Sequence, residues 1–518
     1  MKGLVEIINM QIKVGRKRDN IKKIKLFCIN LFVIFITFGE FIFNTHYSSD
    51  DFYCMFNQKG EAIAVTYQSY RVILGAIYYA LDKWGINVVK FQKYIGLIML
   101  ILFALAVSLI TMIFYNIIEE KMNNCKTLIL INVGSLLLIV NVFVSEWVWF
   151  ALAYIQWGIA VLFSVLAIKL LTKDDALKNY CWALICLIIA AGCYQIAISI
   201  YVFLIMAYIY LKWKGKISIE VVKDILKAAL IAVLAVLINI VISKILGQIN
   251  GMDQVGSRVK ITNIFDKILM IVNYEKEIWK NAEGMMPNYF LIIVAIVDIG
   301  ILIYGYIIGK KNRIANFLWV GVIIISGNAV RWLLVLVQGD FWQPARMLVP
   351  FMCPFVCFNA MIIHHFKGNK RMITINVIMV CLLLLCNFVE IQINKYDCIK
   401  TNTVQEDEMK TITRYINEYE EKNNIQIKYV SVIKDENPSY KYLDILTNKS
   451  YYGEMATRSL VTTWSDAEMV KYYLGKEIEE LELKDEEGLE CFSKKNYDYF
   501  SVEDQVKFEG DRVYICAY

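Results

Sequence analysis

The chain has 518 residues, of which 58% are hydrophobic and 20% are charged, whereas soluble domains are usually about half apolar and a quarter charged. It contains only 3 histidines and 5 prolines, which excludes a histidine-rich metal centre and a proline-rich linker as carriers of function. The net charge of +6 lies in short tracts between apolar runs, where it indicates membrane orientation rather than nucleic-acid binding.

The N-terminal stretch, residues 1–25, is basic and leads directly into the apolar run 26–44. Arg and Lys at 16–18 place this end in the cytoplasm, because positively charged segments stay on the inner side of the membrane. The run has the length of a membrane-spanning helix and lacks the short apolar core and cleavage site of a removable signal peptide. We therefore expect it to remain as an anchor, with the loop 45–93 facing outward.

Further apolar runs follow as far as residue 393, and about 20 residues suffice to cross a bilayer. Two runs have the length of helical hairpins: 127–171, with a break near Ser145 and Glu146, and 180–211, which basic residues flank at both ends. The spans expected after the first are 94–118, the two arms of 127–171, the two arms of 180–211, 228–246, 289–308, 314–337, 347–366 and 373–391. Every loop expected in the cytoplasm contains Lys or Arg. The sequence thus predicts an α-helical polytopic protein with about eleven transmembrane helices over 26–393, in a cytoplasmic (inner or plasma) membrane.

Two outward loops are long enough to have structure of their own. Loop 45–93 contains the apolar segment 70–81, which is too short to span the bilayer and is expected in or near the interface. Loop 248–288 has apolar residues at helical spacing, with Lys267 and Glu275 among the charged residues of the other side. This pattern predicts a helix that lies in the membrane interface.

The tail, residues 394–518, contains more acidic than basic residues and is expected outside the membrane. Alternation at 427–432 predicts a strand, and 406–421 has a helical pattern, so we expect a small extracytoplasmic α/β or α+β domain. Cys491 and Cys516 lie in this tail, where a disulfide is chemically possible.

Asp50 and Asp51 follow the first span at the outer face of the membrane. Adjacent carboxylates raise one another's pKa or require a cation, which suits a general base or a seat for a divalent ion such as Mg²⁺ or Mn²⁺. The alternative is a solvated loop, in which aspartate is common.

Two arginines are candidates for binding phosphate, because the guanidinium fork matches a pair of phosphate oxygens. Arg71 heads the short apolar segment of the first outward loop, and Arg346 lies at the outer end of the ninth and tenth spans. Near Arg346, Trp342 is a candidate for stacking on a sugar ring. The alternatives are arginine side chains that reach lipid headgroups and a tryptophan that anchors the interface.

Other polar residues lie within spans or at their ends. Charges inside a span cost about 2.5 to 3.5 kcal/mol each, so Glu40 is expected to face the same cavity as the acidic pair, and Asp298 is a possible partner for Arg331. Tyr194 and Gln195, at the tip of the second hairpin, can hydrogen-bond to a sugar, although such groups also satisfy helix ends.

The first span, the outward loop with Ser49, Asp50 and Asp51, and the segment from Gln68 to Arg71 that leads into short apolar helices together resemble bacterial GT-C glycosyltransferases. The resemblance is to the membrane glucosyltransferase type that modifies O-antigen, and it covers roughly residues 25–393. It implies an inverting transfer from a polyprenyl-phosphate sugar to an acceptor at the outer face, with Asp50 and Asp51 supplying the catalytic carboxylate. The two aspartates are adjacent here, whereas the family has a spaced acidic motif.

The leading hypothesis is therefore a hexosyltransferase that acts on a cell-envelope glycan or lipid, with the bilayer and a lipid-linked sugar as partners. A polysaccharide polymerase or ligase is also polytopic and rich in outward arginines. A flippase or transporter of lipid-linked glycans requires a polar pathway and often has inverted repeats, and the sequence has neither.

Overall fold

The computed structural model describes residues 2–119, 125–173, 176–252, 255–259, 261, 263–308, 313–339, 341, 343–367, 369–434, 458–481 and 500–517. For residues 2–19, 308, 313, 314 and 316 only the backbone is described. Cys491, Trp342 and the disulfide considered for Cys491 therefore lie outside the described residues, and Cys516 is buried.

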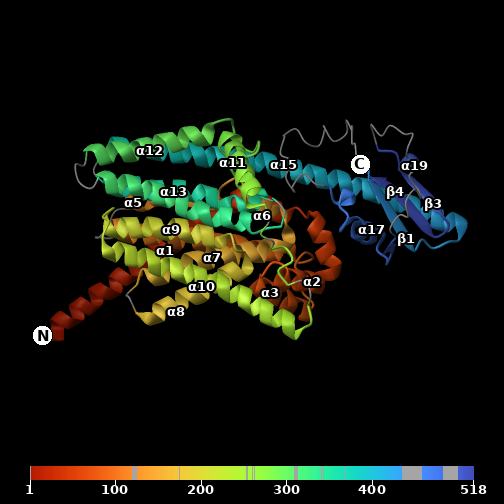
Figure 1. The fold of residues 1–518 in the computed structure, drawn as a ribbon, viewed down its shortest axis with the longest axis horizontal. Helices are drawn as coiled ribbons and strands as arrows, with labels where there is room; N and C mark the ends of the chain where they lie inside the picture. Colours follow the sequence, from red (N-terminus) through yellow and green to blue (C-terminus); the bar gives the residue numbers. More distant parts are fainter. Residues whose placement is uncertain are drawn as a thin grey trace.

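Long apolar helices pack into a bundle (Figure 1). Among the described residues, seven helices are long and apolar enough to cross a membrane. They lie in α1 (Lys2–Phe43), α4 (Gln92–Ile118), α7 (Tyr154–Leu171), α10 (Ile219–Ile249), α12 (Phe290–Ile308), α13 (Arg313–Leu336) and α15 (Lys370–Asn423). Four shorter apolar helices are α5 (Cys125–Leu136), α8 (Leu177–Cys193), α9 (Ala197–Trp213) and α14 (Cys353–His365). These helices occupy the places of the apolar runs in the sequence, and the number that crosses a bilayer stays a prediction.

The chain between α5 and α7 is irregular and buried. After residues 137–143 come α6 (Val144–Trp149) and the 3-10 turn η1 (Ala151–Ala153). The break expected at Ser145 and Glu146 is therefore not an exposed tip, because both residues lie in α6 and have 0% exposure. Irregular backbone at this depth needs internal partners, and one of them is the Asn387 amide oxygen, which accepts from the N–H of Val142 at 2.8 Å.

The second predicted hairpin breaks where expected. Helix α8 ends at Cys193, Tyr194 has an extended backbone (φ −157°, ψ 120°), and α9 begins at Ala197. The break leaves the side chains of Tyr194 and Gln195 at the end of the bundle that also carries α2 (Ser49–Tyr67) and α3 (Val72–Lys83), opposite the N-terminus (Figure 1).

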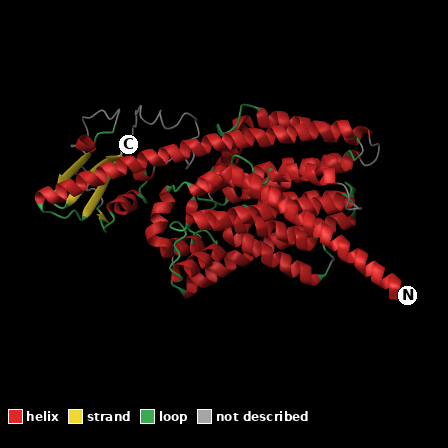
Figure 2. Cartoon of the chain, turned by 180° about the vertical axis from the view of Figure 1, so that it is seen from behind, coloured by secondary structure: helices red, strands yellow, loops and turns green. Residues whose placement is uncertain are grey.

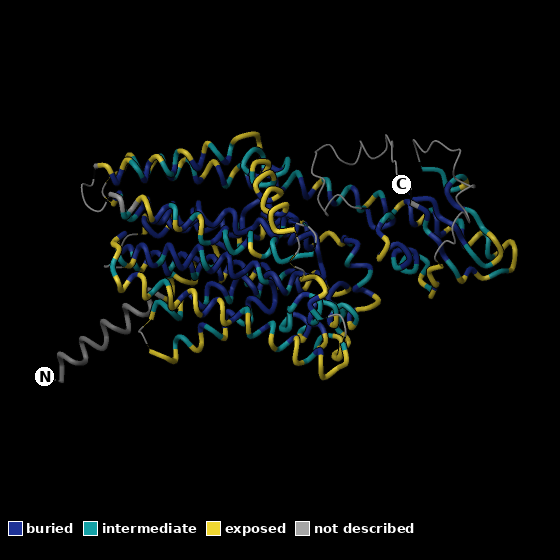
Figure 3. The backbone as a smooth tube through the Cα atoms, viewed as in Figure 1, coloured by how far each residue is buried: buried dark blue, intermediate teal, exposed yellow. Residues whose placement is uncertain are grey.

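Helix α11 (Ile264–Asn281) packs at the same end and exposes much of its surface (Figure 3). Part of its apolar side points outward, since Phe265 is 84% exposed, whereas Ile271 and Ile278 are buried. The charged side expected in solvent is partly turned into the protein: Lys267 is buried and donates to the carbonyls of Leu336 and Gln338. Glu275 binds Arg331. The helix at this position is as predicted, but Lys267 and Glu275 are internal partners rather than a solvated face.

Helix α15 continues without a break from the bundle into the tail (Figure 2). The expected span 373–391 and the expected tail helix 406–421 are thus one helix. Its far end covers a four-stranded sheet formed by β1 (Tyr429–Lys434), β2 (Glu479–Glu480), β3 (Val506–Glu509) and β4 (Arg512–Ala517). The strand order is β2-β1-β4-β3, with β1 parallel to both neighbours and β3 antiparallel to β4.

Short helices complete the tail. They are η5 (Ser459–Val461), α17 (Asp466–Leu474) and α19 (Val502–Gln505). The buried side chains of this region form a hydrophobic core that also includes Phe52 from the start of α2. The tail therefore packs against the loop that carries the acidic pair.

Candidate active site

The acidic pair opens helix α2. Ser48 is the N-cap residue and forms a capping box with Asp51, in which each side chain binds the backbone N–H of the other. Two aspartates in the first turn also suit the positive end of the helix dipole. The pair is thus placed by ordinary helix-start chemistry, and its two members then point to different surroundings.

Asp51 is fully buried and saturated with donors. Its Oδ2 accepts from the Ser48 N–H and hydroxyl, both at 2.8 Å, and from the Ala151 N–H at 3.3 Å. Its Oδ1 accepts from the Leu152 N–H at 2.7 Å. Burial raises the pKa of Asp51 to about 7, while hydrogen bonds from Ser48 and Leu152 act in the opposite direction. This carboxylate joins the start of α2 to η1.

Asp50 is only partly buried and faces the tail. The indole N–H of Trp464 donates to its Oδ1 at 2.9 Å. Asp50 also lies close enough to Glu61 of α2 to affect its ionisation. The pKa of Glu61 is raised to about 7, mainly by burial and also by Asp50, while Arg258 and Arg71 act to lower it.

Arginines lie near Glu61 and near one another: Arg71 and Arg258 both lower the pKa of Glu61. Burial lowers the pKa of Arg71, Tyr194 opposes this shift, and Arg258 and Arg346 lower the pKa further, so the three guanidinium groups are electrostatic neighbours. We call Asp50, Glu61, Arg71, Arg258 and Arg346 the acidic–basic cluster. The cluster combines the partly exposed carboxylate of Asp50 with arginine side chains in a region where burial limits the access of water.

Arg71 is held by the two residues predicted at the hairpin tip. Its Nε donates to Oε1 of Gln195 at 3.3 Å, and its guanidinium lies 4.6 Å from the centre of the Tyr194 ring. The amide of Gln195 also donates to the carbonyl of Ser69. Among the described residues, the two terminal nitrogens of Arg71 make no hydrogen bond. They are available to an anion.

Arg346 is anchored more firmly. Its Nη1 lies 2.6 Å from Oε1 of Glu146, its backbone N–H donates to the same carboxylate, and its guanidinium lies 4.7 Å from the centre of the Phe150 ring. Glu146 is fully buried. The carboxylate therefore fixes Arg346 in place and offsets part of its charge.

Several residues singled out from the sequence lie elsewhere. Glu40 is 61% exposed at its side chain and pairs with Lys395 of α15, because α15 passes beside the end of α1; it does not join the cluster. The expected Asp298–Arg331 pair is wrong: Arg331 binds Glu275 and the amide oxygen of Asn328.

Four residues of the candidate site were not predicted from the sequence: Glu61, Glu146, Arg258 and Trp464. Arg258 had the clearest signal, since it is a basic residue in a loop expected outside, against the usual bias. Glu61 and Trp464 belong to no local pattern, and only the fold brings them to Asp50.

The metal expectation rested on Asp50 and Asp51. No group of three or more His, Cys, Asp or Glu side chains that could hold a metal occurs in the described part of the chain. The oxygens of Asp51 accept from N–H and O–H donors, which a cation would have to displace. The surroundings of Asp51 therefore do not fit an ion bridging the pair.

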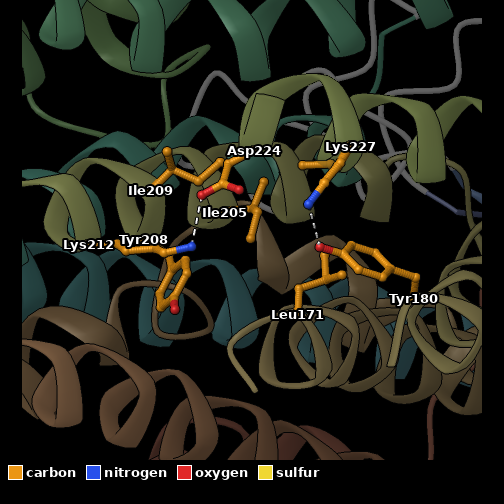
Figure 4. A pocket seen from close by; sticks show the side chains of 9 residues that line it. Leu171, Tyr180, Ile205, Tyr208, Ile209, Lys212, Asp224 and Lys227 are labelled. Atoms are coloured by element: carbon orange, nitrogen blue, oxygen red, sulfur yellow. Dashed lines mark hydrogen bonds and ion pairs between the residues drawn. The ribbon is translucent and has the colours of Figure 1, made fainter. Parts of the chain in front are cut away.

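A pocket lies at the opposite end of the bundle, between α8, α9 and α10 (Figure 4). An ion pair of 2.8 Å joins Lys212 to Asp224, and Lys227 donates to the Tyr180 hydroxyl at 3.1 Å. Lys212 and Gln195 lie near opposite ends of α9, about 25 Å apart at 1.5 Å per residue. The pocket is thus separate from the acidic–basic cluster.

The bundle of apolar helices and the acidic–basic cluster at one of its ends identify the class. The chain is a polytopic helical membrane protein with a polar site at one end of its bundle. The chain belongs to the glucosyl transferase GtrII family, whose sequence profile matches residues 39–363, more than half of its length. It is accordingly a glycosyltransferase. The matched range contains every member of the cluster, whereas α15 and the sheet lie outside it. No curated protein matches the chain.

Proposed function

We propose that this glycosyltransferase moves a hexose-like sugar from a polyprenyl-phosphate donor to a cell-envelope glycan or lipid acceptor, at the outer face of the cytoplasmic membrane. The observation that carries the proposal is the acidic–basic cluster. A group of two carboxylates and three arginines at one end of the bundle matches a reaction that removes a proton from a hydroxyl and releases a phosphate.

In the proposed step the acceptor hydroxyl oxygen attacks the anomeric carbon of the sugar. The bond from that carbon to the phosphate oxygen breaks, and the polyprenyl phosphate leaves with the electron pair. Asp50 takes the acceptor proton, and Arg71, Arg258 and Arg346 stabilise the departing anion. Attack opposite the leaving group inverts the anomeric centre.

We assign the base to Asp50 and a positioning role to Asp51. Asp50 is partly exposed and lies near Glu61, whereas Asp51 is fully buried and accepts from Ser48, Ala151 and Leu152. The proposed step needs no ion shared by the pair.

The outer-face location is supported by charge. The bundle end opposite the cluster carries the loop with Lys214 and Lys216 and the basic N-terminus, and positive loops favour the cytoplasm. The bilayer itself and a lipid-linked donor are then the partners at the other end.

The test uses purified protein in nanodiscs with polyprenyl-phosphate glucose and extracted cell-envelope glycan, and measures labelled glucose in the glycan. We expect Asp50→Asn to reduce transfer by about 100-fold or more, in the range of a lost general base. Asp266→Asn, an exposed aspartate on α11, is the matched control. Full activity of Asp50→Asn would overturn the assignment of the base.

Two other outcomes separate the remaining candidate functions. Products that carry many added sugars per acceptor would indicate a polymerase. Movement of the lipid-linked sugar across sealed vesicles without any covalent product would indicate a flippase.

A further inference from the structure

The tail is built into the loop that carries the acidic pair. The hydroxyl of Ser49 donates to that of Thr462 at 3.2 Å, and the hydroxyls of Tyr47 and Tyr472 are hydrogen-bonded at 3.2 Å. Phe52 is buried in the hydrophobic core of the tail. Residues on both sides of Asp50 are therefore fixed to the tail segment 458–474.

This segment is itself firmly held by α15. Arg458 forms a buried ion pair with Glu408, and the N–H of Ser459 donates to Oε1 of Gln405 at 2.8 Å. The hydroxyl of Ser465 then closes the turn by donating to the carbonyl of Ser459 at 2.8 Å. Buried polar contacts of this kind favour a single backbone geometry.

Trp464 stands on this rigid turn and is 56% exposed. One edge of its indole is tied to Asp50 by the N–H hydrogen bond, so the ring is placed beside the carboxylate while much of its surface stays open. A single exposed hydrophobic residue usually needs no explanation. Here the same ring binds the proposed base, which makes its exposure informative.

We propose that Trp464 is the platform of an acceptor subsite, on which a pyranose ring of the acceptor glycan stacks with one hydroxyl directed to Asp50. An aromatic face offers apolar contact to the C–H face of a sugar, and the polar edge of tryptophan stays hydrogen-bonded. This inference rests on the proposed function, since it names the residue that binds the acceptor of that reaction.

The arrangement favours the acceptor over the donor. Two arginines that suit the donor phosphate lie on the bundle side: Arg71 donates to Gln195 at the α8–α9 break, and Arg258 donates to the hydroxyl of Ser69 at 3.5 Å. Trp464 lies on the tail side. Two substrates that meet at Asp50 would therefore approach from these two sides, with the lipid-linked sugar on the bundle side.

The experiment compares Trp464→Ala and Trp464→Phe with wild type in the nanodisc assay, at varied concentrations of extracted glycan. Trp84→Ala is the matched control, because Trp84 is also exposed (75%) and ends α3 at the same end of the bundle. Release of polyprenyl phosphate in the absence of glycan reports the donor half of the site separately.

We expect Trp464→Ala to raise the KM for glycan by about 3- to 10-fold, in the range of an aromatic contact. The KM for the donor should stay within about twofold of wild type, and the slow release of phosphate to water should fall less than the transfer to glycan at low glycan concentration. Trp464→Phe keeps the aromatic face and should recover most of the glycan affinity. Trp84→Ala should leave both constants unchanged.

Other results overturn the inference. An unchanged glycan KM in Trp464→Ala means that no sugar stacks on Trp464. If Trp464→Ala lowers the rate of the reaction by the same factor with and without glycan, and Trp464→Phe does not recover it, the indole only positions Asp50. If Trp464→Ala elutes as an aggregate, Trp464→Leu takes its place, since it keeps apolar bulk but removes the aromatic face, and it should raise the glycan KM by a similar factor. A wild-type protein that neither transfers sugar nor releases phosphate refutes the proposed function itself.

Discussion

The two aspartates illustrate how adjacent identical residues take different roles. Asp51 satisfies two backbone N–H groups of the 151–152 turn and both donors of Ser48. Asparagine at position 51 would turn an N–H₂ group toward some of these donors. Leaving a buried polar group unsatisfied costs about 1 to 3 kcal/mol.

We therefore predict that Asp51→Asn lowers the midpoint of thermal unfolding in detergent by several degrees, while Asp50→Asn leaves it nearly unchanged. Size-exclusion after a heating series measures this midpoint. A destabilised Asp50→Asn with a wild-type-like Asp51→Asn would reverse the roles assigned to the pair.

Glu61 gives the site a pH dependence. Burial and Asp50 raise its pKa to about 7, so Glu61 is largely neutral below that pH and becomes anionic above it. Its negative charge then offsets the arginines that attract the donor phosphate, whose single charge does not change in this range. The KM for the donor should rise as the pH increases through about 7.

The predicted increase is about 3- to 10-fold between pH 6 and pH 8, as expected for one charge at short range in partly screened surroundings. Steady-state kinetics at constant ionic strength measure it, and Glu61→Gln should remove the dependence. A wild-type KM that stays flat across this range, or a Glu61→Gln variant that keeps the slope, would contradict the prediction.

At the residue scale, the sequence indicates those residues of the proposed site that have a local signal. Asp50, Arg71 and Arg346 lie in loops that are predicted at the outer face, and Tyr194 and Gln195 interrupt an apolar run. Glu146 was visible only as a break in the apolar run, and its bond to Arg346 joins positions 200 residues apart. Such pairing depends on packing that one sequence does not encode locally.

Among the elements, apolar length is the strongest signal in the sequence, because every backbone polar group in a bilayer must be satisfied internally. The helices accordingly occupy the predicted runs. Helix α11 shows the limit of this reasoning. Its hydrophobic periodicity predicts a helix, but not which side faces the protein, since lipid and protein interior are both apolar.

The burial of Lys267 on α11 has a consequence for stability. Lys267 donates to the carbonyls of Leu336 and Gln338 at the end of α13, where a cation also complements the helix dipole. We predict that Lys267→Met lowers the unfolding midpoint in detergent. The expected loss in the free energy of unfolding is about 1 to 2 kcal/mol.

Lys276→Met is the matched control for this prediction, because Lys276 lies on the same helix and is exposed. It should behave as wild type in the same melting series. Equal midpoints for the two variants would show that the contacts of Lys267 contribute nothing to stability.

For the whole molecule, the two ends of the bundle differ in charge and in content. One end carries the basic N-terminus and the loop between α9 and α10, and the other carries the cluster and the tail (Figure 1). Because α15 runs unbroken from one end through the tail, the side on which the sheet lies is set by the direction of this helix. The continuity of α15 could not be read from the sequence, where its composition changes from apolar to charged near residue 394.

This arrangement predicts the orientation directly. Alkaline phosphatase, which is active only outside the cytoplasm, should be active when fused after residue 518 and inactive when inserted at residue 215, in the loop between α9 and α10. Green fluorescent protein should show the reverse. The contrast should be at least about tenfold, because positive charge strongly biases the side of short loops. The same side for both fusion sites would contradict the odd number of crossings that is predicted between them. A reversed pattern would place Asp50 and the tail in the cytoplasm, away from an acceptor in the cell envelope.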